Sequence, residues 1–172
     1  MTEIQVIEAV QRVFLASTAG EWAAIALARV WIFLYAPLIV WLWASGAKRE
    51  RHLAGEALWA MAWALLFGEV ISLLVLRVRP FLAVPEVVAL IPPPLTSSFP
   101  SLHTAVSTAI TLTLFSANRV AGWSGVLVLL GVVLGRVAAG VHYPSDILGG
   151  LALGCVAFAM VRWGHKAVRR RR

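Results

Sequence analysis

The feature that most constrains this chain is a series of apolar runs, each close to the length that crosses a membrane. The runs occupy residues 22–44, 54–76, 102–117, 123–139 and 146–163. A bilayer core needs about 20 helical residues to cross it. The composition, 60% hydrophobic and only 13% charged, also lies far outside the range of soluble domains. The sequence therefore predicts an all-α integral membrane bundle with five transmembrane helices.

The positions of the basic residues indicate which helix ends face the cytoplasm. They fall in alternate connections and in the C-terminal tail, at Lys48, Arg49, Arg51, Arg119, Lys166 and Arg169–Arg172. By the positive-inside rule this side is cytoplasmic, so connections 77–100 and 140–144 face outward. The net charge of +7 comes largely from flanks of this kind, with no folded basic domain, so we expect no nucleic-acid partner.

The N-terminal residues follow a different pattern. Between residues 2 and 20, apolar residues recur at helical spacing opposite Glu3, Glu8 and Arg12, which is typical of an amphipathic helix at a membrane surface. We expect an amphipathic helix or a sixth helix of the bundle here, because the acidic start does not fit a signal peptide. We expect one membrane domain over residues 1–172, with residues 1–20 as the amphipathic helix and residues 164–172 as a basic cytoplasmic tail.

Two charged residues lie inside the apolar runs. Arg29 and Glu69 are each about seven residues from an outer helix end, or about 10 Å deep at 1.5 Å per residue. Charges inside membranes tend to be paired, so we expect Arg29 and Glu69 to face each other or a polar site. The alternative is that Arg29 extends to the membrane surface by itself.

The stretch Gly135–Asp146 concentrates charge in an otherwise apolar chain. His142 and Asp146 are four residues apart, so at the start of a helix the carboxylate can reach the imidazole. Arg136 can face the same pocket across a turn at Gly140. The alternative is a polar turn between two apolar helices, with Asp146 as a simple helix cap.

Two further polar stretches reach the same face of the membrane. Arg77 and Arg79 follow the second apolar run, and Ser97–His103 leads into the third. Pro100 fits the first position of a helix, with Ser98 as its cap. The free N–H groups of that helix N-terminus would then point into the region and favour an anion.

These stretches together suit the cleavage of a phosphate ester. The side chains able to hold phosphate oxygens are Arg79, Arg136, Ser101 and Arg77. His103 and His142 supply one group to attack phosphorus and one to protonate the departing oxygen.

In order and spacing the motifs resemble those of the type-2 phosphatidic acid phosphatase superfamily, membrane lipid phosphatases that share their site with vanadium haloperoxidases. The matching pattern lies within residues 54–163 and reads R-P, then P-S-x-H, then an arginine followed by a histidine and an aspartate. The resemblance implies that His142 forms a phosphohistidine, that Asp146 orients it, and that His103 protonates the leaving group. The residues implied to hold the phosphate are Arg79, Ser101 and Arg136. No metal or other cofactor is implied.

Three positions depart from the family pattern. The family usually has a lysine seven residues before the arginine of R-P, where this chain has Ser72. Either Arg77 supplies the missing charge or the phosphate is held more weakly. Leu102 replaces a glycine, and Gly135 replaces a serine that could donate one hydrogen bond to phosphate.

The sequence thus predicts a lipid phosphatase of the cytoplasmic (inner) membrane, with its active site on the extracytoplasmic face and its C-terminus in the cytoplasm. Its partners would be a lipid phosphate substrate and membrane lipids, and the motifs specify no oligomeric state. The pattern is most similar to the small bacterial undecaprenyl-diphosphate phosphatases. The alternatives are a phosphatidylglycerophosphate or phosphatidic acid phosphatase, and a non-catalytic lipid-binding protein of the same fold.

Overall fold

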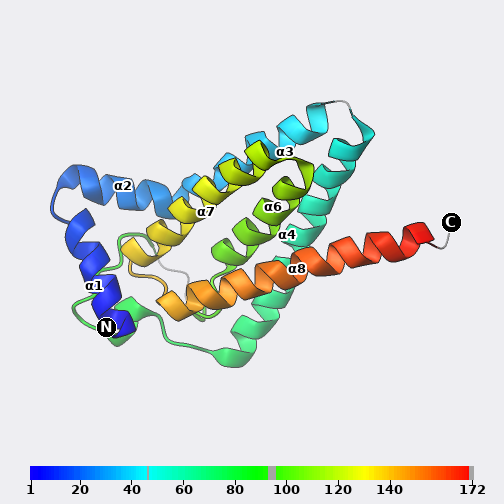
Figure 1. Cartoon of the computed structure of the whole chain (residues 1–172). Helices are drawn as coiled ribbons and strands as arrows, with labels where there is room; N and C mark the ends of the chain where they lie inside the picture. The colour runs from blue at the N-terminus through cyan, green and yellow to red at the C-terminus, as the bar shows by residue number, and fades with distance from the viewer. Residues whose placement is uncertain (46, 93–95, 171–172) are drawn as a thin grey trace.

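The chain folds into a bundle of helices, described by a computed structural model for residues 1–45, 47–92 and 96–170, with only the backbone of residues 165–170 (Figure 1). No strand forms among these residues. The elements are α1 (Glu3–Phe14), α2 (Thr18–Arg29), the 3₁₀ helix η1 (Trp31–Leu34), α3 (Tyr35–Ala44), α4 (Lys48–Val75), α5 (Pro80–Ala83), α6 (Leu102–Ala117), α7 (Arg119–Ala138) and α8 (Pro144–Arg170). The predicted all-α class is confirmed. The last two residues of the predicted basic tail, Arg171 and Arg172, lie outside the described residues.

Helix α6 is the central helix of the bundle. It contacts α4, α7 and α8, and ten of its 16 residues are buried. The approach of α8 is close because Gly150 and Gly154 face the α6 backbone: a Cβ at Gly154 would lie 2.5 Å from the carbonyl oxygen of Ala105. Small residues allow such close packing between membrane helices. The contact fixes the first turns of α6 and α8 relative to each other.

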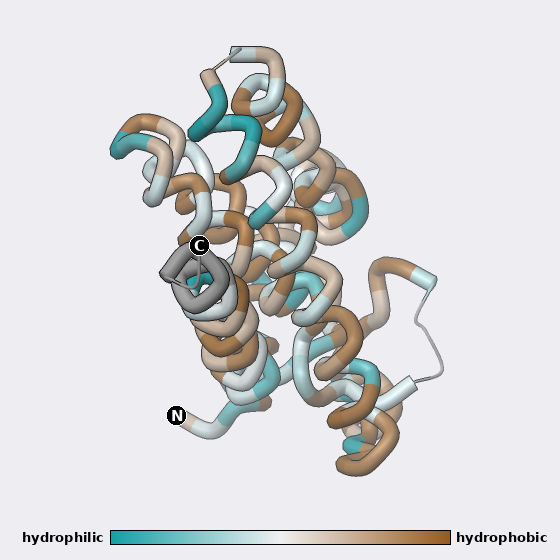
Figure 2. The backbone as a smooth tube through the Cα atoms, turned by 90° about the vertical axis from the view of Figure 1, so that its right-hand side faces the viewer, coloured by the Kyte–Doolittle hydropathy of each residue, from teal (hydrophilic) through white to brown (hydrophobic). Residues whose placement is uncertain are grey.

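Among the described residues, three stretches are each long and apolar enough to cross a membrane: Lys48–Ala83, which contains α4, then Arg119–Ala138 and Pro144–Gly164. The bent pair Thr18–Arg29 and Trp31–Ala44 would be a fourth if it forms one span. Figure 2 shows hydrophobic residues along much of the helical length and a hydrophilic stretch at the start of α4, near the top of the view. Helix α6 is apolar but has only 16 residues, about 24 Å at 1.5 Å per residue. These are the helices of a multi-pass membrane protein, and the count of five spans stays a prediction.

The first apolar run does not form one straight helix. Residues 22–44 divide among α2, η1 and α3, and the axis bends by 56° at the break. Pro37 lies in the first turn of α3, where it has no N–H to donate to Phe33 and its ring would clash with that carbonyl in a continuous α-helix. The missing bond to Phe33 falls within η1 and favours 3₁₀ geometry there, whereas the bend itself lies earlier, at Val30.

Helix α1 is amphipathic and docks on the end of the bundle where α7 ends and α8 begins (Figure 1). Thr2 caps it with a reciprocal hydrogen bond to Gln5, and Ile7 is fully buried. The amide of Gln11 donates to the carbonyls of Val88 at 2.7 Å and Ala138 at 3.0 Å. The N-terminal helix is thus fastened to the connection that follows α5 and to the end of α7.

Candidate active site

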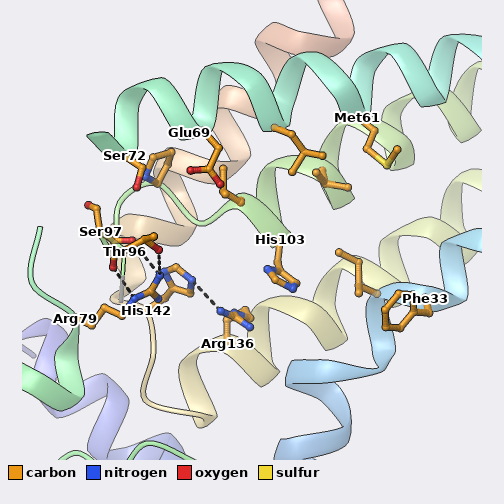
Figure 3. A pocket seen from close by; sticks show the side chains of 15 residues that line it. Phe33, Met61, Glu69, Ser72, Arg79, Thr96, Ser97, His103, Arg136 and His142 are labelled. Atoms are coloured by element: carbon orange, nitrogen blue, oxygen red, sulfur yellow. Dashed lines mark hydrogen bonds between the residues drawn. The ribbon is translucent and has the colours of Figure 1, made fainter. Parts of the chain in front are cut away.

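A cavity of about 460 Å³ lies among η1, α4, α6 and α7, beside the turn that leads into α8 (Figure 3). It is apolar toward η1 and the middle of α4. Its polar lining consists of Glu69, Ser72, Arg79, Thr96, Ser97, His103, Arg136 and His142. Four of the seven predicted site residues therefore meet in one cavity: His103, His142, Arg79 and Arg136.

His142 is held in an orientation that suits a nucleophile. Gly140 adopts a φ of +69° and turns the chain between α7 and α8, which buries His142 at 3% exposure. Its Nδ1 lies 2.8 Å from the carbonyl oxygen of Ser98 and 3.5 Å from Oδ2 of Asp146. Both neighbours are acceptors, so Nδ1 carries the proton and donates it. The lone pair is left on Nε2, 3.3 Å from Nη2 of Arg136.

The surroundings of His142 also keep its ring neutral. Burial lowers the pKa of His142 to about 4, against a smaller opposite effect of the hydrogen bond to Asp146 and with a further decrease from the positive charges of Arg136 and Arg79. At neutral pH the imidazole is therefore unprotonated, which is the form that can attack phosphorus.

Asp146 does not line the cavity and is fully buried beside His142. Its Oδ2 accepts a hydrogen bond from the backbone N–H of Tyr143 at 2.8 Å, and its Oδ1 accepts one from Arg77 at 2.6 Å. Its backbone carbonyl accepts from the N–H of Ser101 at 3.0 Å. The predicted approach of Asp146 to His142 is present in the structure.

Arg79 and Arg136 bring two buried positive charges to the cavity. Arg79 donates to the carbonyls of Thr96, Ser97 and Val141, each at 3.0 Å, which fixes its guanidinium. Arg136 donates to Ala28 at 3.3 Å, whereas its Nε is buried without a hydrogen-bond partner. An unsatisfied donor of a cation costs free energy that an anionic ligand would recover.

His103 extends from the first turn of α6 into the cavity, and Figure 3 shows it opposite Arg136. Ser101 does not line the cavity: it is fully buried, and its hydroxyl accepts a hydrogen bond from Thr104 at 3.0 Å. Helix α6 begins at Leu102 with Ser101 as its N-cap residue.

The predicted helix start at Pro100 is therefore wrong by two residues, and the cap is Ser101 instead of the predicted Ser98. Ser98 donates its backbone N–H to the carbonyl of Arg77 at 2.9 Å, and its own carbonyl accepts from His142. These two bonds hold the segment before α6 outside the helix.

Arg77 does not line the cavity either. Its guanidinium contacts Asp146 on the side away from His142, donates to Oε2 of Glu3 at 2.8 Å, and lies 4.1 Å above the ring of Tyr143. Burial by itself would raise the pKa of Glu3, but hydrogen bonds from Ser145 and Arg77 lower it below its usual value. Sequence reasoning missed Glu3 as part of this site, because an acid in the first turn of an amphipathic helix carries no motif.

The wall formed by α4 carries Glu69 and Ser72 and no positive charge. Glu69 lines the cavity as predicted, but the prediction that Arg29 faces Glu69 or the site is wrong. Arg29 is exposed at the end of α2 and makes no ion pair within the described part of the chain. Nor do three or more histidine, cysteine, aspartate or glutamate side chains gather as a metal site among the described residues. The cavity thus offers a fixed imidazole, a second histidine and two arginines.

The chain is similar in sequence to two bacterial proteins. The chain is 34% identical over 128 residues to the undecaprenyl-diphosphatase BcrC of Bacillus subtilis, covering 73% of this chain and 64% of that protein. It is 30% identical over 131 residues to the bacitracin transport permease protein BcrC of Bacillus licheniformis, covering 76% and 64%. In both cases the matched region is slightly less than two thirds of the relative's length.

A solved structure supports the fold. LpxE of Aquifex aeolicus superposes with a TM-score of 0.77 over 91% of this chain and 92% of that one, at 18% identity. Residues 53–170 match the PAP2 superfamily, and this range contains His103, Arg136, His142 and Asp146. The chain therefore belongs to the PAP2 superfamily.

Proposed function

We propose that this protein is a membrane lipid phosphatase that hydrolyses a phosphate or diphosphate monoester through a phosphohistidine. The observation that carries the proposal is the state of His142, whose proton is fixed on Nδ1 by the Ser98 carbonyl while Nε2 is directed to the cavity beside Arg136. A buried neutral imidazole with this tautomer has its Nε2 lone pair free to attack phosphorus.

The reaction then needs two transfers of the phosphoryl group. Nε2 of His142 forms a bond to phosphorus as the bond to the leaving oxygen breaks, and His103 donates a proton to that oxygen. Water next attacks phosphorus as the bond from phosphorus to Nε2 of His142 breaks, His103 takes the proton from the water, and phosphate leaves the regenerated imidazole. Asp146 stabilises the positive charge that develops on the imidazole.

The phosphate oxygens would be held mainly by two of the predicted ligands. Arg79 and Arg136 line the cavity, and the unpartnered Nε of Arg136 provides a charge-assisted donor. Ser101, by contrast, would reach the phosphate only if its hydroxyl turned from Thr104. Arg77 contacts no part of the cavity, so we assign it another role below.

The substrate we favour is undecaprenyl diphosphate, converted to undecaprenyl phosphate. The name of the Bacillus subtilis relative supports this choice. An apolar cavity of about 490 Å³ next to the polar one, between α3 and α4, offers space for a hydrocarbon chain. The runner-up substrates are phosphatidylglycerophosphate and phosphatidic acid.

The proposed placement is a single domain in the cytoplasmic membrane, with the active site outside and the C-terminus inside. The α2–η1–α3 pair, α4, α6, α7 and α8 would make five spans, and α1 would lie at the outer surface. The exposed basic residues at the start of α4 and at Arg119 support this orientation, because both lie at the end of the bundle opposite the cavity.

The test is phosphate release by the purified protein in detergent from a panel of polyprenyl and glycerolipid phosphates. His142→Ala should abolish release, whereas His52→Ala, a matched change at the exposed start of α4, should not. Equal release by wild type and His142→Ala from every lipid would support the alternative, a non-catalytic lipid-binding protein.

A further inference from the structure

Arg77 lies between two carboxylates that come from distant parts of the chain. Its Nη1 donates to Oδ1 of Asp146 at 2.6 Å, and its Nη2 donates to Oε2 of Glu3 at 2.8 Å. The hydroxyl of Ser145 accepts a further bond from Nη1 at 2.6 Å, and the ring of Tyr143 covers the guanidinium face. The guanidinium is thus already occupied on the side of Asp146 that faces away from the cavity.

The contacts of Asp146 show how Arg77 affects the orientation of its carboxylate. Arg77 holds Oδ1, and the backbone N–H of Tyr143 holds Oδ2. With both oxygens held, the carboxylate cannot rotate, and Oδ2 stays 3.5 Å from Nδ1 of His142. The orientation of the proposed nucleophile therefore depends on a residue that does not itself line the cavity.

Glu3 extends this chain of contacts to the N-terminal helix. Its Oε2 binds Arg77, and its Oε1 accepts the backbone N–H of Ser145 at 2.8 Å, next to Asp146. Helix α1 is fastened independently by the buried Ile7 and by Gln11, so Glu3 is presented from a fixed helix. Glu3 also lies outside residues 53–170, the part of the chain that matches the family.

We propose that Glu3 and Arg77 are positioning residues for the catalytic pair His142–Asp146, and that α1 is required for full activity through this contact. The proposal rests on the proposed phosphatase function. In this proposal Arg77 orients Asp146 and does not bind the phosphate. The amphipathic helix α1 contributes to activity by holding Arg77 through Glu3.

The first experiment separates positioning from phosphate binding. In steady-state kinetics, Arg77→Gln should lower kcat by about 10- to 100-fold, the size of effect that a misplacement of about 1 Å produces. KM and the inhibition constant of orthovanadate should change less than about threefold, because the cavity arginines are intact. Arg136→Gln should instead raise the orthovanadate constant. Arg77→Lys should recover part of kcat, since it restores the charge.

The second experiment measures the pH dependence of kcat/KM. If Arg77 and Glu3 only stabilised the fold, their loss would not shift the acid limb of this profile in opposite directions. The charged or titratable groups around His142 and Asp146 are Arg77, Arg79, Arg136, Glu3 and His103, with the phenol of Tyr143 beside them. Loss of the positive charge in Arg77→Gln makes protonation of His142 easier, so the acid limb should move to higher pH. Loss of the negative charge in Glu3→Gln should move it to lower pH.

The controls are matched to each change. Glu8→Gln and Arg12→Gln alter the same helix, and neither side chain makes an ion pair within the described part of the chain, so both should behave as wild type. The double variant Glu3→Gln/Arg77→Gln should have the kcat of Arg77→Gln alone, because Glu3 acts through Arg77. Thermal unfolding in detergent checks that each variant is folded.

The outcomes distinguish the two proposals. A wild type that releases no phosphate, or a His142→Ala variant as active as wild type, would count against the phosphatase function itself. An active, His142-dependent enzyme in which Glu3→Gln and Arg77→Gln keep wild-type kcat and acid limb would overturn only the positioning role. A raised orthovanadate constant in Arg77→Gln, with kcat unchanged at saturation, would return Arg77 to the phosphate site.

Discussion

The charge of Asp146 should account for a large part of the catalytic rate, and Asp146→Asn tests this directly. The carboxylate lies 3.5 Å from Nδ1 of His142, and at an effective dielectric constant of about 20 two unit charges at that distance interact by about 5 kcal/mol. Only part of a positive charge has developed on the imidazole in the transition state. Half a charge corresponds to about 2.4 kcal/mol, and each 1.36 kcal/mol is tenfold in rate.

Asp146→Asn should therefore lower kcat by between about 60-fold and about 3,000-fold, the range from half to full charge development. The assay is phosphate release at saturating lipid in detergent, together with single-turnover trapping of the phosphoenzyme. Thermal unfolding should show a lower Tm as well, since Arg77 loses the partner of a partly buried ion pair.

The matched control is another buried carboxylate at a distance from the cavity. Glu56 is 3% exposed and pairs with Arg162 at 3.0 Å toward the other end of α4. Glu56→Gln should lower Tm but leave kcat near that of wild type. An Asp146→Asn variant within about threefold of wild-type kcat would refute the electrostatic role and leave Asp146 as a helix cap only.

Three further predictions concern the cavity. Ser72→Lys places a positive charge on the α4 wall, so the inhibition constant of orthophosphate should fall about tenfold, as a charge-assisted hydrogen bond of about 1.4 kcal/mol gives; an unchanged constant would show that the side chain cannot reach the anion. Because burial lowers the pKa of His142 to about 4, kcat/KM should stay flat from pH 7 down to about 5 once substrate ionisation is corrected for, and stability should rise with pH between about 4 and 6.5, where the unfolded chain binds the extra proton. Met61→Trp fills the wall shared by the two cavities, so KM should rise for a long-chain lipid phosphate and not for a short soluble one.

Much of the site follows from sequence because its parts are close in sequence. His142 and Asp146 meet through four-residue helical spacing, and Arg136 reaches His142 across a turn that Gly140 allows. The topology predicted from the basic residues places His103 on the same face of the membrane. For such residues, helix geometry and topology predict which side chains lie near one another before any tertiary packing is known.

The remaining features depend on packing between distant segments. Glu3 meets Arg77 across 74 residues and Ser145 across 142, and neither contact leaves a periodic signal. The sequence predicts that Arg77 lies near the predicted phosphate-binding residues. Which side of Asp146 it contacts depends on where α1 docks. The helix start at Leu102 depends in the same way on two hydrogen bonds of Ser98, whose N–H donates to Arg77 and whose carbonyl accepts from His142. A cap pattern in the sequence does not contain these bonds.

The two neighbouring cavities explain why the proposed substrate is a lipid and not a soluble phosphate. The polar cavity holds Arg79, Arg136 and both histidines, and the apolar one between α3 and α4 has almost no polar lining. Four side chains belong to both: Ile32, Phe33, Met61 and Val106. A molecule with a phosphate at one end and a hydrocarbon chain at the other can therefore occupy both without burying its charge in the apolar part. The bend at Val30, between α2 and η1, belongs to this geometry, because Ile32 and Phe33 of η1 form the wall that joins the two cavities.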